Sequence, residues 1–449
     1  MVNIRTSAML LTAGVLLTAC GDQSQIPQEN FFGPDPQLPE PTTSLLPTLH
    51  VAEAVGWPEG RTPIAAAGAQ VTLFADSLQN PRWLYELPNG DVLVAEAQGP
   101  EGGSPGGIKG WVTGLVKSRA ISDAPNANRI SLLRDVDGDG IAEVRLPFLE
   151  GLSSPFGMAL VGDYLYVANA DSLVRYPYES GQDMITAPPQ LVQDLTLGTL
   201  NHHWTKNLIA HPDRRSLYVA IGSNSNVGEN GMDEEVGRAA IWEVDIETGT
   251  SRIYASGLRN PVGMAWNPVT GELWTAVNER DELGSDLVPD YMTSVQEGGF
   301  YGWPWRYYGV HVDDRVDAPM PVADSEVLTP DYALGNHTAS LGLTWVGESS
   351  LPAPFTNGMI VGQHGSWNRK PRSGYKVIFV PFENGAPSGD PVDVLTGFVE
   401  DDKAYGRPVG VIIDQRGGLL VADDVGGAVW RVMGTEEFRG TEELAPPTP

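Results

Sequence analysis

The stretch from Asn260 to Ala276 reads NPVGMAWNPVTGELWTA, and its pattern decides the fold. Two runs of apolar, β-branched and aromatic residues flank a turn made of Asn, Pro, Thr and Gly. Strand-forming runs joined by such turn residues are typical of a β-hairpin. Pro261 disfavours helix at Asn260 and therefore places Asn260 in a loop before the first strand. The stretch predicts a hairpin that begins at a loop rim.

The same pattern recurs along the chain. It is found in residues 80–96, 154–169, 204–221, 340–362 and 407–423. The six units begin about 50–80 residues apart without a long amphipathic helix between them, which disfavours parallel βαβ folds. Six such units suit an all-β, six-bladed β-propeller with long inter-strand loops. We expect the strand near Val71 to pair with the last blade and close the ring, because closure removes free sheet edges.

Composition limits the classes of partner. The 449 residues include 52 Gly and 36 Pro, yet 41% are hydrophobic, which indicates a loop-rich globular protein rather than a disordered one. The net charge is −29. Nucleic acid is therefore not an expected partner, because phosphate binding needs a basic face. A small or neutral substrate fits this composition better.

The N-terminus resembles a bacterial lipoprotein signal. Arg5 precedes an apolar run, and Leu-Thr-Ala leads to Cys20, the one cysteine of the chain. A single cysteine excludes an internal disulfide and a multi-cysteine metal site. The apolar run is short for a bilayer span. We predict a lipoprotein signal peptide over residues 1–19, lipid on Cys20, and a periplasmic protein anchored to the outer membrane.

The remaining boundaries follow from composition. Residues 20–60 are rich in Pro, Gln, Asn and Thr and show little apolar periodicity, which predicts a flexible tether. Residues 61–433 contain the six repeated units and form the predicted propeller domain. Residues 434–449 are rich in Glu and Pro and are expected to be a disordered tail.

Histidines are concentrated in the stretch from Asn201 to Asp213, which holds three of the seven in the chain. Histidine is the side chain best able to take a proton near neutral pH. Polar groups also lie beside apolar strands at Arg259-Asn260 and in the stretch from His364 to Arg369. We expect these stretches to converge at the mouth of the propeller. The alternative is that the histidines are hydrogen-bonded structural residues.

Two acidic segments are candidate metal sites. One carries carboxylates at nearly alternating positions around glycines: Asp135, Asp137, Asp139 and Glu143. Hard oxygens at this spacing suit Ca²⁺ in a structural role, although Leu146 stands where an EF-hand loop has its last ligand. The alternative is an acidic hairpin turn. The other segment, residues 278–286, holds four carboxylates, and either binds a divalent cation or forms a solvated loop.

Four motifs together resemble a known family. Residues 201–207 (NHHWTKN), 257–263 (GLRNPVG), 298–304 (GGFYGWP) and 362–369 (GQHGSWNR) are similar to the sorbosone dehydrogenase family. That family belongs to the soluble quinoprotein glucose and pyranose dehydrogenases, and the resemblance runs from about Val55 to Val432. It implies a six-bladed propeller that holds pyrroloquinoline quinone (PQQ) and Ca²⁺ on one face. It also implies oxidation of an aldose or aldosone at its anomeric carbon.

The resemblance further implies residue roles. His203 matches the general base, and Arg259 matches an arginine near the quinone carbonyl. The remaining predicted cofactor ligands are Arg82, His202, Lys206, Asn260, His364, Trp367, Asn368, Arg369 and Arg407. Asn278 and Glu279 stand where the glucose enzymes supply Ca²⁺ through the backbone carbonyls of Gly-Pro. His202 stands where those enzymes have Asp. Because of these two departures, the pKa of the base, the way the metal is held and the identity of the substrate remain open.

Two other functions remain open from the residues alone. A metal-dependent lactone hydrolase would need residues 278–286 as a carboxylate-rich site at the channel mouth. A propeller that only binds partners at the cell envelope would need no catalytic base. In the dehydrogenase interpretation, the electrons pass to a quinone or cytochrome of the respiratory chain.

Overall fold

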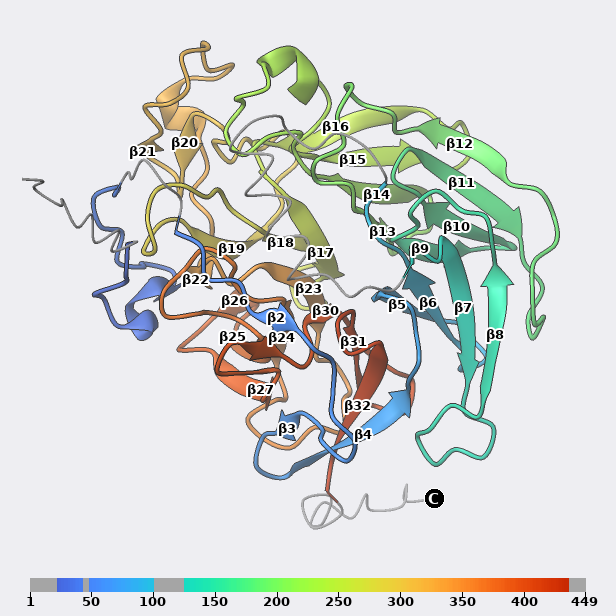
Figure 1. The fold of residues 1–449 in the computed structure, drawn as a ribbon. Helices are drawn as coiled ribbons and strands as arrows, with labels where there is room; N and C mark the ends of the chain where they lie inside the picture. Colours follow the sequence, from blue (N-terminus) through green and yellow to red (C-terminus); the bar gives the residue numbers. More distant parts are fainter. Residues whose placement is uncertain (1–21, 43–47, 101–124, 436–449) are drawn as a thin grey trace, which may run out of the picture.

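The computed structural model describes residues 22–42, 48–100 and 125–435, and its regular structure is almost entirely β. Six antiparallel sheets of at least four strands surround a common axis (Figure 1). The first blade contains β5 (Pro81–Glu86), β6 (Val92–Glu96), β7 (Arg129–Arg134) and β8 (Val144–Leu149). The second contains β9 (Met158–Val161), β10 (Tyr164–Ala168), β11 (Ser172–Pro177) and β12 (Gln190–Asp194). The third contains β13 (Lys206–Ala210), β14 (Ser216–Ile221), β15 (Ala240–Asp245) and β16 (Ser251–Ser256).

The other three blades follow the same plan with longer insertions. The fourth blade contains β17 (Pro261–Trp266), β18 (Leu273–Val277), β19 (Pro289–Ser294) and β22 (Tyr332–Asn336). The fifth contains β23 (Ser340–Trp345), β24 (Gly358–Gln363), β25 (Lys376–Glu383) and β27 (Val392–Thr396). The sixth contains β30 (Pro408–Ile413), β31 (Leu419–Asp423), β32 (Ala428–Gly434) and β4 (Ala69–Ala75). The remaining strands are only two residues long: β1 (Phe32–Gly33), β2 (Glu53–Ala54), β3 (Ile64–Ala65), β20 (Arg306–Tyr307), β21 (His311–Val312), β26 (Ala386–Pro387), β28 (Val399–Glu400) and β29 (Lys403–Ala404). The short 3-10 helices are η1 (Gln28–Phe31), η2 (Met232–Glu235) and η3 (Asp324–Glu326).

The ring of blades is closed in two ways, by contacts between the innermost strands and by strand pairing in the last blade. The innermost strands β5, β9, β13, β17, β23 and β30 contact one another in cyclic order around the shaft. In the sixth blade β4, from the N-terminal part of the chain, pairs antiparallel with the C-terminal β32, with Val71 opposite Val432. This pairing completes the last sheet with a strand from the other end of the chain, as the sequence predicts. The predicted six-bladed propeller is confirmed.

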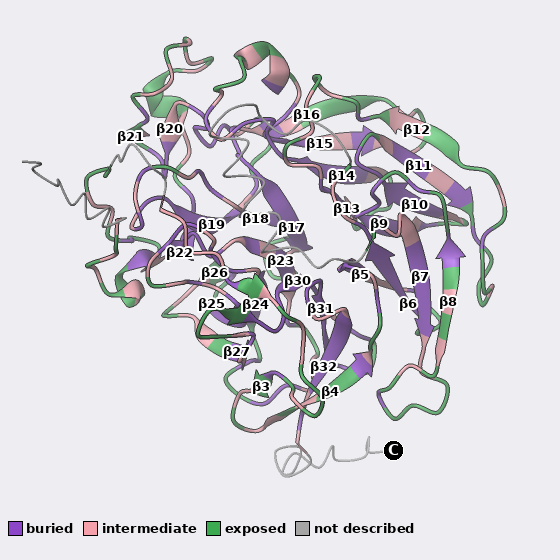
Figure 2. Cartoon of the chain, viewed as in Figure 1, coloured by how far each residue is buried: buried purple, intermediate pink, exposed green. Residues whose placement is uncertain are grey.

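Neighbouring blades share their cores, which explains the continuous apolar runs. In β31, Leu419 and Val421 pack with side chains of the fifth blade, whereas Leu420 and Ala422 pack with side chains of the first. Successive residues of a strand point to opposite faces, so a strand covered on both faces is apolar throughout. Figure 2 shows this burial along the inner strands and greater exposure on outer strands such as β12 and β16.

The repeated glycine of the motif is a packing requirement at the shaft. A Cβ at Gly263 of β17 would lie 2.5 Å from the backbone nitrogen of Leu343, and one at Gly342 of β23 would lie 2.2 Å from the carbonyl oxygen of Val409. Inner strands therefore approach one another so closely that no side chain fits between them. Gly263 is the last residue of a Pro-Val-Gly triplet, whereas Gly342 follows Ser-Leu.

The segment predicted as a tether departs from expectation. In its described parts, Phe31 and Ala52 are fully buried, and β1 pairs with β22. The expectation of a flexible chain over residues 20–60 is corrected for residues 22–42 and 48–60, because their few apolar side chains find partners on the propeller. Strand β32 ends at Gly434. The predicted signal peptide, Cys20 and residues 436–449 lie outside the described residues. Within the described ranges, no helix has the length and apolarity to cross a membrane.

Candidate active site

The predicted polar stretches meet at one end of the shaft, which we call the site face. His203, Arg259 and Arg407 precede the inner strands of three different blades, and His364 follows the second strand of another. Because adjacent strands run antiparallel, the start of an inner strand and the end of the next strand lie at the same end of a blade. The opposite end, formed by the turns between these two strands, is the far face.

His203 is held as a neutral base. Its Nδ1 lies 2.8 Å from the carbonyl oxygen of Ser223 and 3.0 Å from the hydroxyl oxygen of the same residue. Nδ1 must donate to the carbonyl, which leaves the lone pair on Nε2. Burial, followed by the charge of Arg259, holds the pKa of His203 well below its usual value of 6.5. The imidazole can therefore accept a proton at neutral pH.

His203 and Asn260 come together over Gly222. A methyl group at Gly222 would lie 2.3 Å from Oδ1 of Asn260 and 2.6 Å from Cβ of His203. Only glycine leaves room for both side chains at this point. The convergence of the histidine stretch with the Arg259-Asn260 stretch is thus observed.

Two cationic side chains, Lys206 and Arg238, hold the loop that carries His203. Lys206 is fully buried, and its ammonium group donates to Oδ1 of Asn201 (3.2 Å) and to the carbonyl oxygens of His203 (3.3 Å) and Trp204 (3.1 Å). Its three donors are used, so the prediction that Lys206 binds the cofactor is corrected. Arg238 also donates to the carbonyl of His203 at 3.0 Å. Sequence reasoning missed Arg238, which carries no motif signal.

Arg259 is enclosed by acceptors. Its guanidinium donates to the carbonyl oxygens of Asn226 (3.1 Å), Asn278 (3.1 Å) and Glu279 (2.7 Å), and to Oδ1 of Asn226 (3.0 Å). Four of its five N–H donors are used within the chain, and its positive charge also acts on His203. The two carbonyls to which the resemblance assigns Ca²⁺ face this cation. A second cation there would be repelled, so the structure gives no support to Ca²⁺ at Asn278 and Glu279.

A second imidazole, His337, lies beside Arg259. Its Nδ1 is 3.3 Å from the carboxylate of Asp281, which also lies 3.7 Å from Arg259 and accepts a 2.7 Å hydrogen bond from Asn368. Although burial lowers the pKa of His337, the Asp281 carboxylate outweighs it and raises this pKa. The sequence contained no pattern that singled out His337.

Three carboxylates of residues 278–286 are paired with groups of the chain. Glu279 pairs with the buried Arg280, Asp281 is used by His337 and Asn368, and Asp286 lies 3.4 Å from Arg369. In the part of the chain that the structure describes, no group of metal-binding side chains gathers here. The lactone hydrolase alternative loses its candidate metal site.

A third cluster is centred on Asp424. Its carboxylate pairs with Arg82 and lies 2.9 Å from Nε2 of His364. Arg407 is close enough for its charge to act on both partners of that pair. Despite burial, the charges of His364, Arg82 and Arg407 hold the pKa of Asp424 well below its usual range. Three predicted residues are therefore brought together around Asp424, which sequence reasoning missed.

The other predicted ligands are placed differently. Arg369 donates to the carbonyl oxygen of Ser285 (2.9 Å) and to the hydroxyl of Ser24 (3.0 Å), so the prediction that it binds the cofactor is corrected. Its guanidinium fastens the N-terminal segment. Trp367 accepts a hydrogen bond through its backbone carbonyl from His50. His202 is exposed, with its ring 4.8 Å from that of His203.

The carboxylates predicted to bind structural Ca²⁺ gather at the far face. Ligand oxygens of Asp135, Asp137, Asp139 and Glu143 all lie within 4.8 Å of one another in the turn between β7 and β8. Asp135 also pairs with Arg416 at 2.6 Å. The cluster is separated from the site face by the length of a blade.

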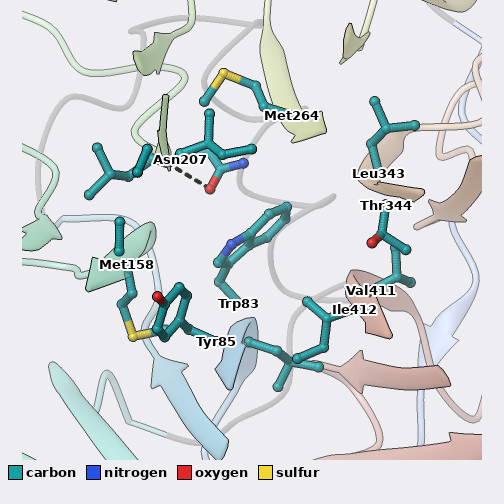
Figure 3. Close-up of a pocket in the computed structure, with 14 residues that line it drawn as sticks. Trp83, Tyr85, Met158, Asn207, Met264, Leu343, Thr344, Val411 and Ile412 are labelled. Carbon is teal, nitrogen blue, oxygen red and sulfur yellow. Dashed lines mark hydrogen bonds between the residues drawn. The ribbon is translucent and has the colours of Figure 1, made fainter. Parts of the chain in front are cut away.

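The shaft itself holds an apolar cavity of about 300 Å³ (Figure 3). Trp83 points into its middle, and Met158, Met264, Leu343 and Val411 come from other blades to line it. None of the predicted site residues lines this cavity. The cavity in the shaft and the clusters at the site face are therefore lined by different residues.

Fold and site define a six-bladed β-propeller with imidazole and guanidinium groups at one mouth of its shaft. The chain belongs to the TrAA12-like family, whose model matches residues 137–295 and 322–435. Aldose sugar dehydrogenase YliI of Escherichia coli is 24% identical over 309 residues, which cover 64% of this chain and 76% of that protein.

Solved structures share the propeller fold. A Trichoderma reesei protein of carbohydrate-active enzymes family AA12 is 19% identical, with a TM-score of 0.66 over 88% of this chain and all of its own. The PQQ domain of pyranose dehydrogenase from Coprinopsis cinerea, in its holo form, is 18% identical, with a TM-score of 0.65 over 85% of this chain and all of its own.

Proposed function

We propose that this protein is a PQQ-dependent sugar dehydrogenase that oxidises the anomeric carbon of an aldose or aldosone. The observation that carries the proposal is the neutral His203, with Nδ1 committed to Ser223, meeting Asn260 at the same mouth as the Asp424 cluster. The similarity to an aldose sugar dehydrogenase and the family membership support it.

The residues at the site face fit a planar polyanion such as PQQ. Nε of Arg82, Nε of Arg407, Oδ1 of Asn260 and Oδ1 of Asn368 are buried atoms without a hydrogen-bond partner in the described part of the chain. Unsatisfied buried polar atoms are rare in folded proteins, and each is a position at which a bound group can pair. Arg82 and Arg407 would hold carboxylates of PQQ, and Asn260 and His364 would hold its other polar edges.

The chain's own residues provide base catalysis. When bound, PQQ supplies the acceptor for the two electrons that leave the anomeric carbon. His203 takes the hydroxyl proton of the sugar at Nε2, while its Nδ1–H stays on the carbonyl of Ser223. Burial, together with the charge of Arg259, keeps the ring neutral before the reaction, and Arg259 provides positive charge where negative charge develops on an oxygen. Lys206 and Arg238 hold the loop that aims the ring.

Reconstitution tests this proposal. The absorption spectrum of the purified protein is expected to change on addition of PQQ with Ca²⁺, and the loaded protein should reduce a redox dye with aldoses or aldosones. Lactone hydrolysis without PQQ would favour the hydrolase instead. Absence of any PQQ-induced change would contradict the dehydrogenase and leave a propeller that only binds partners.

We also propose that the cluster at Asp135, Asp137, Asp139 and Glu143 binds Ca²⁺ and stabilises the fold. Calcium at 100 times its dissociation constant should raise the free energy of unfolding by about 2.7 kcal/mol. Thermal unfolding with and without Ca²⁺ measures this effect. The double substitution Asp137→Asn and Asp139→Asn should remove the response to Ca²⁺. A response that survives the substitution would place the ion elsewhere.

The cell location rests on the N-terminal sequence. We propose that Cys20 carries lipid at the periplasmic side of the outer membrane, and that a respiratory quinone or cytochrome receives the electrons. Labelling with a fatty-acid analogue tests the first part. The absence of label on Cys20 would reject the anchor.

A further inference from the structure

The N-terminal segment begins on the site face. The carboxylate of Asp22 accepts a hydrogen bond from the backbone N–H of Ser285, and the hydroxyl of Ser285 donates to the carbonyl of Asp22 at 3.2 Å. Two residues further on, the N–H of Ser24 donates to the carbonyl of Lys370 at 2.7 Å. Ser285 follows the second strand of the fourth blade and Lys370 that of the fifth, so both belong to loops of the site face.

Later described residues of the N-terminal segment also contact loops of this face. The N–H of Thr42 donates to the carbonyl of Leu283 (3.0 Å), and that of His50 to the carbonyl of Trp367 (2.8 Å). Trp57 then donates through its indole N–H to the carboxylate of Asp423 at 2.6 Å, beside the Asp424 cluster. The segment thus contacts loops of the fourth, fifth and sixth blades, all at the same end (Figure 1).

The starting point of the segment is close to the candidate catalytic groups. The carbonyl of Gly284, next to Ser285, lies 2.9 Å from Nε2 of His337. His337 contacts Asp281, which in turn contacts Arg259. Asp22 is therefore connected to Arg259 through one loop of the site face.

This geometry limits how far the site face can be from a lipid on Cys20. Cys20 stands two residues before Asp22, and two residues span at most about 7 Å even when fully extended. We propose that the lipid-anchored chain holds its site face against the membrane surface, so that the catalytic mouth opens toward the lipid headgroups. The net charge of −29 does not favour anionic lipids, so the anchor rather than charge sets this orientation.

The proposal goes beyond sugar oxidation and does not depend on it. It requires only that Cys20 carries lipid and that residues 22–42 and 48–57 stay bound as described. A mouth at the membrane surface would favour a lipid-soluble electron acceptor over one that diffuses in the periplasm.

Two label positions on one blade test the orientation. Glu282 is exposed in a site-face loop, and Glu272 is exposed in a far-face turn of the same blade. The lipidated full-length chain has its one cysteine occupied, so Glu282→Cys and Glu272→Cys can each be labelled with a fluorophore. On phosphatidylcholine vesicles that carry a headgroup-bound quencher, the label at 282 should be quenched several-fold more than the label at 272. Equal quenching, or stronger quenching at 272, would overturn the proposal.

A linker variant separates the anchor from the face. Insertion of a 20-residue Gly-Ser linker after Gly21 allows a root-mean-square span of about 25 Å, and should bring the two quenching values close together. If the difference persisted, the face would bind lipid by its own chemistry, contrary to the proposal. Mass spectrometry of Cys20 completes the test, because an unmodified cysteine would also overturn it. No step needs PQQ or sugar, so failure here is distinguishable from failure of the proposed dehydrogenase activity.

Discussion

Replacement of His203 by Asn is expected to lower kcat of the PQQ-loaded protein by about 10²–10⁴-fold, the usual contribution of a general base. The variant should still fold, because the polar partners of the loop backbone, Lys206 and Arg238, are unchanged. His211 provides the matched control. It belongs to the same stretch but lies in the far-face turn beside Asp213. His211→Asn should retain nearly full activity, and an equal loss in both variants would argue against His203 as the base.

The pH profile gives an independent measurement on the same residue. Burial and Arg259 depress the pKa of His203, so the basic form persists below pH 6.5 and the acid limb of kcat/KM should lie below that value. Arg259→Gln removes a cation that opposes protonation, so the limb should move to higher pH. A purely structural Arg259 would change stability without moving the limb, and circular dichroism separates these outcomes.

Asp424→Asn should lower the free energy of unfolding by about 3–5 kcal/mol, because it leaves buried cations without their counter-charge. Asp424 is 8% exposed and pairs with Arg82 and His364. Its pKa is depressed in the fold, so its contribution is present above the unfolded pKa of about 3.9 and is lost as pH falls below it. The difference between the two proteins should therefore shrink in acid, as measured by urea unfolding at several pH values.

A polyanionic cofactor should reverse part of this loss. PQQ would neutralise Arg82 and Arg407, so its addition should stabilise Asp424→Asn more than the unchanged protein. Asp414→Asn is the control, because Asp414 is equally buried and pairs with Arg431 at 2.8 Å in a far-face turn. It should lose stability without rescue by PQQ. Equal rescue in both variants would contradict a cofactor site at Asp424.

Several features of the site were predictable because they accompany the strand pattern. His203, Arg259 and Arg407 stand directly before inner strands, and His364 directly after a second strand. Once the repeats indicate a propeller, antiparallel pairing alone brings these positions to one face. Whether a side chain there faces a ligand was not predictable. Lys206 and Arg369 belong to the same two sequence stretches as His203 and His364. Their N–H groups, however, donate hydrogen bonds to acceptors within the chain.

The residues that sequence reasoning missed depend on partners far along the chain. Asp424 is 342 positions from Arg82 and 60 from His364. No local pattern encodes such a contact, because it exists only after blades one, five and six are assembled. The N-terminal segment shows the same effect in backbone terms. Its proline-rich composition indicates flexibility, but Phe31 and Trp57 are ordered by surfaces that the propeller provides.

The amino-acid order by itself therefore determined the strands, the six repeated units and the end of each blade at which polar groups lie. These follow from side-chain alternation and turn chemistry, which act over a few residues. Only the tertiary structure decided the tautomer of His203, the counter-charges of Arg259 and Asp424, and the course of the N-terminal segment across the site face. Those depend on burial and on charges a few ångströms apart in space, which the spacing along a chain does not report.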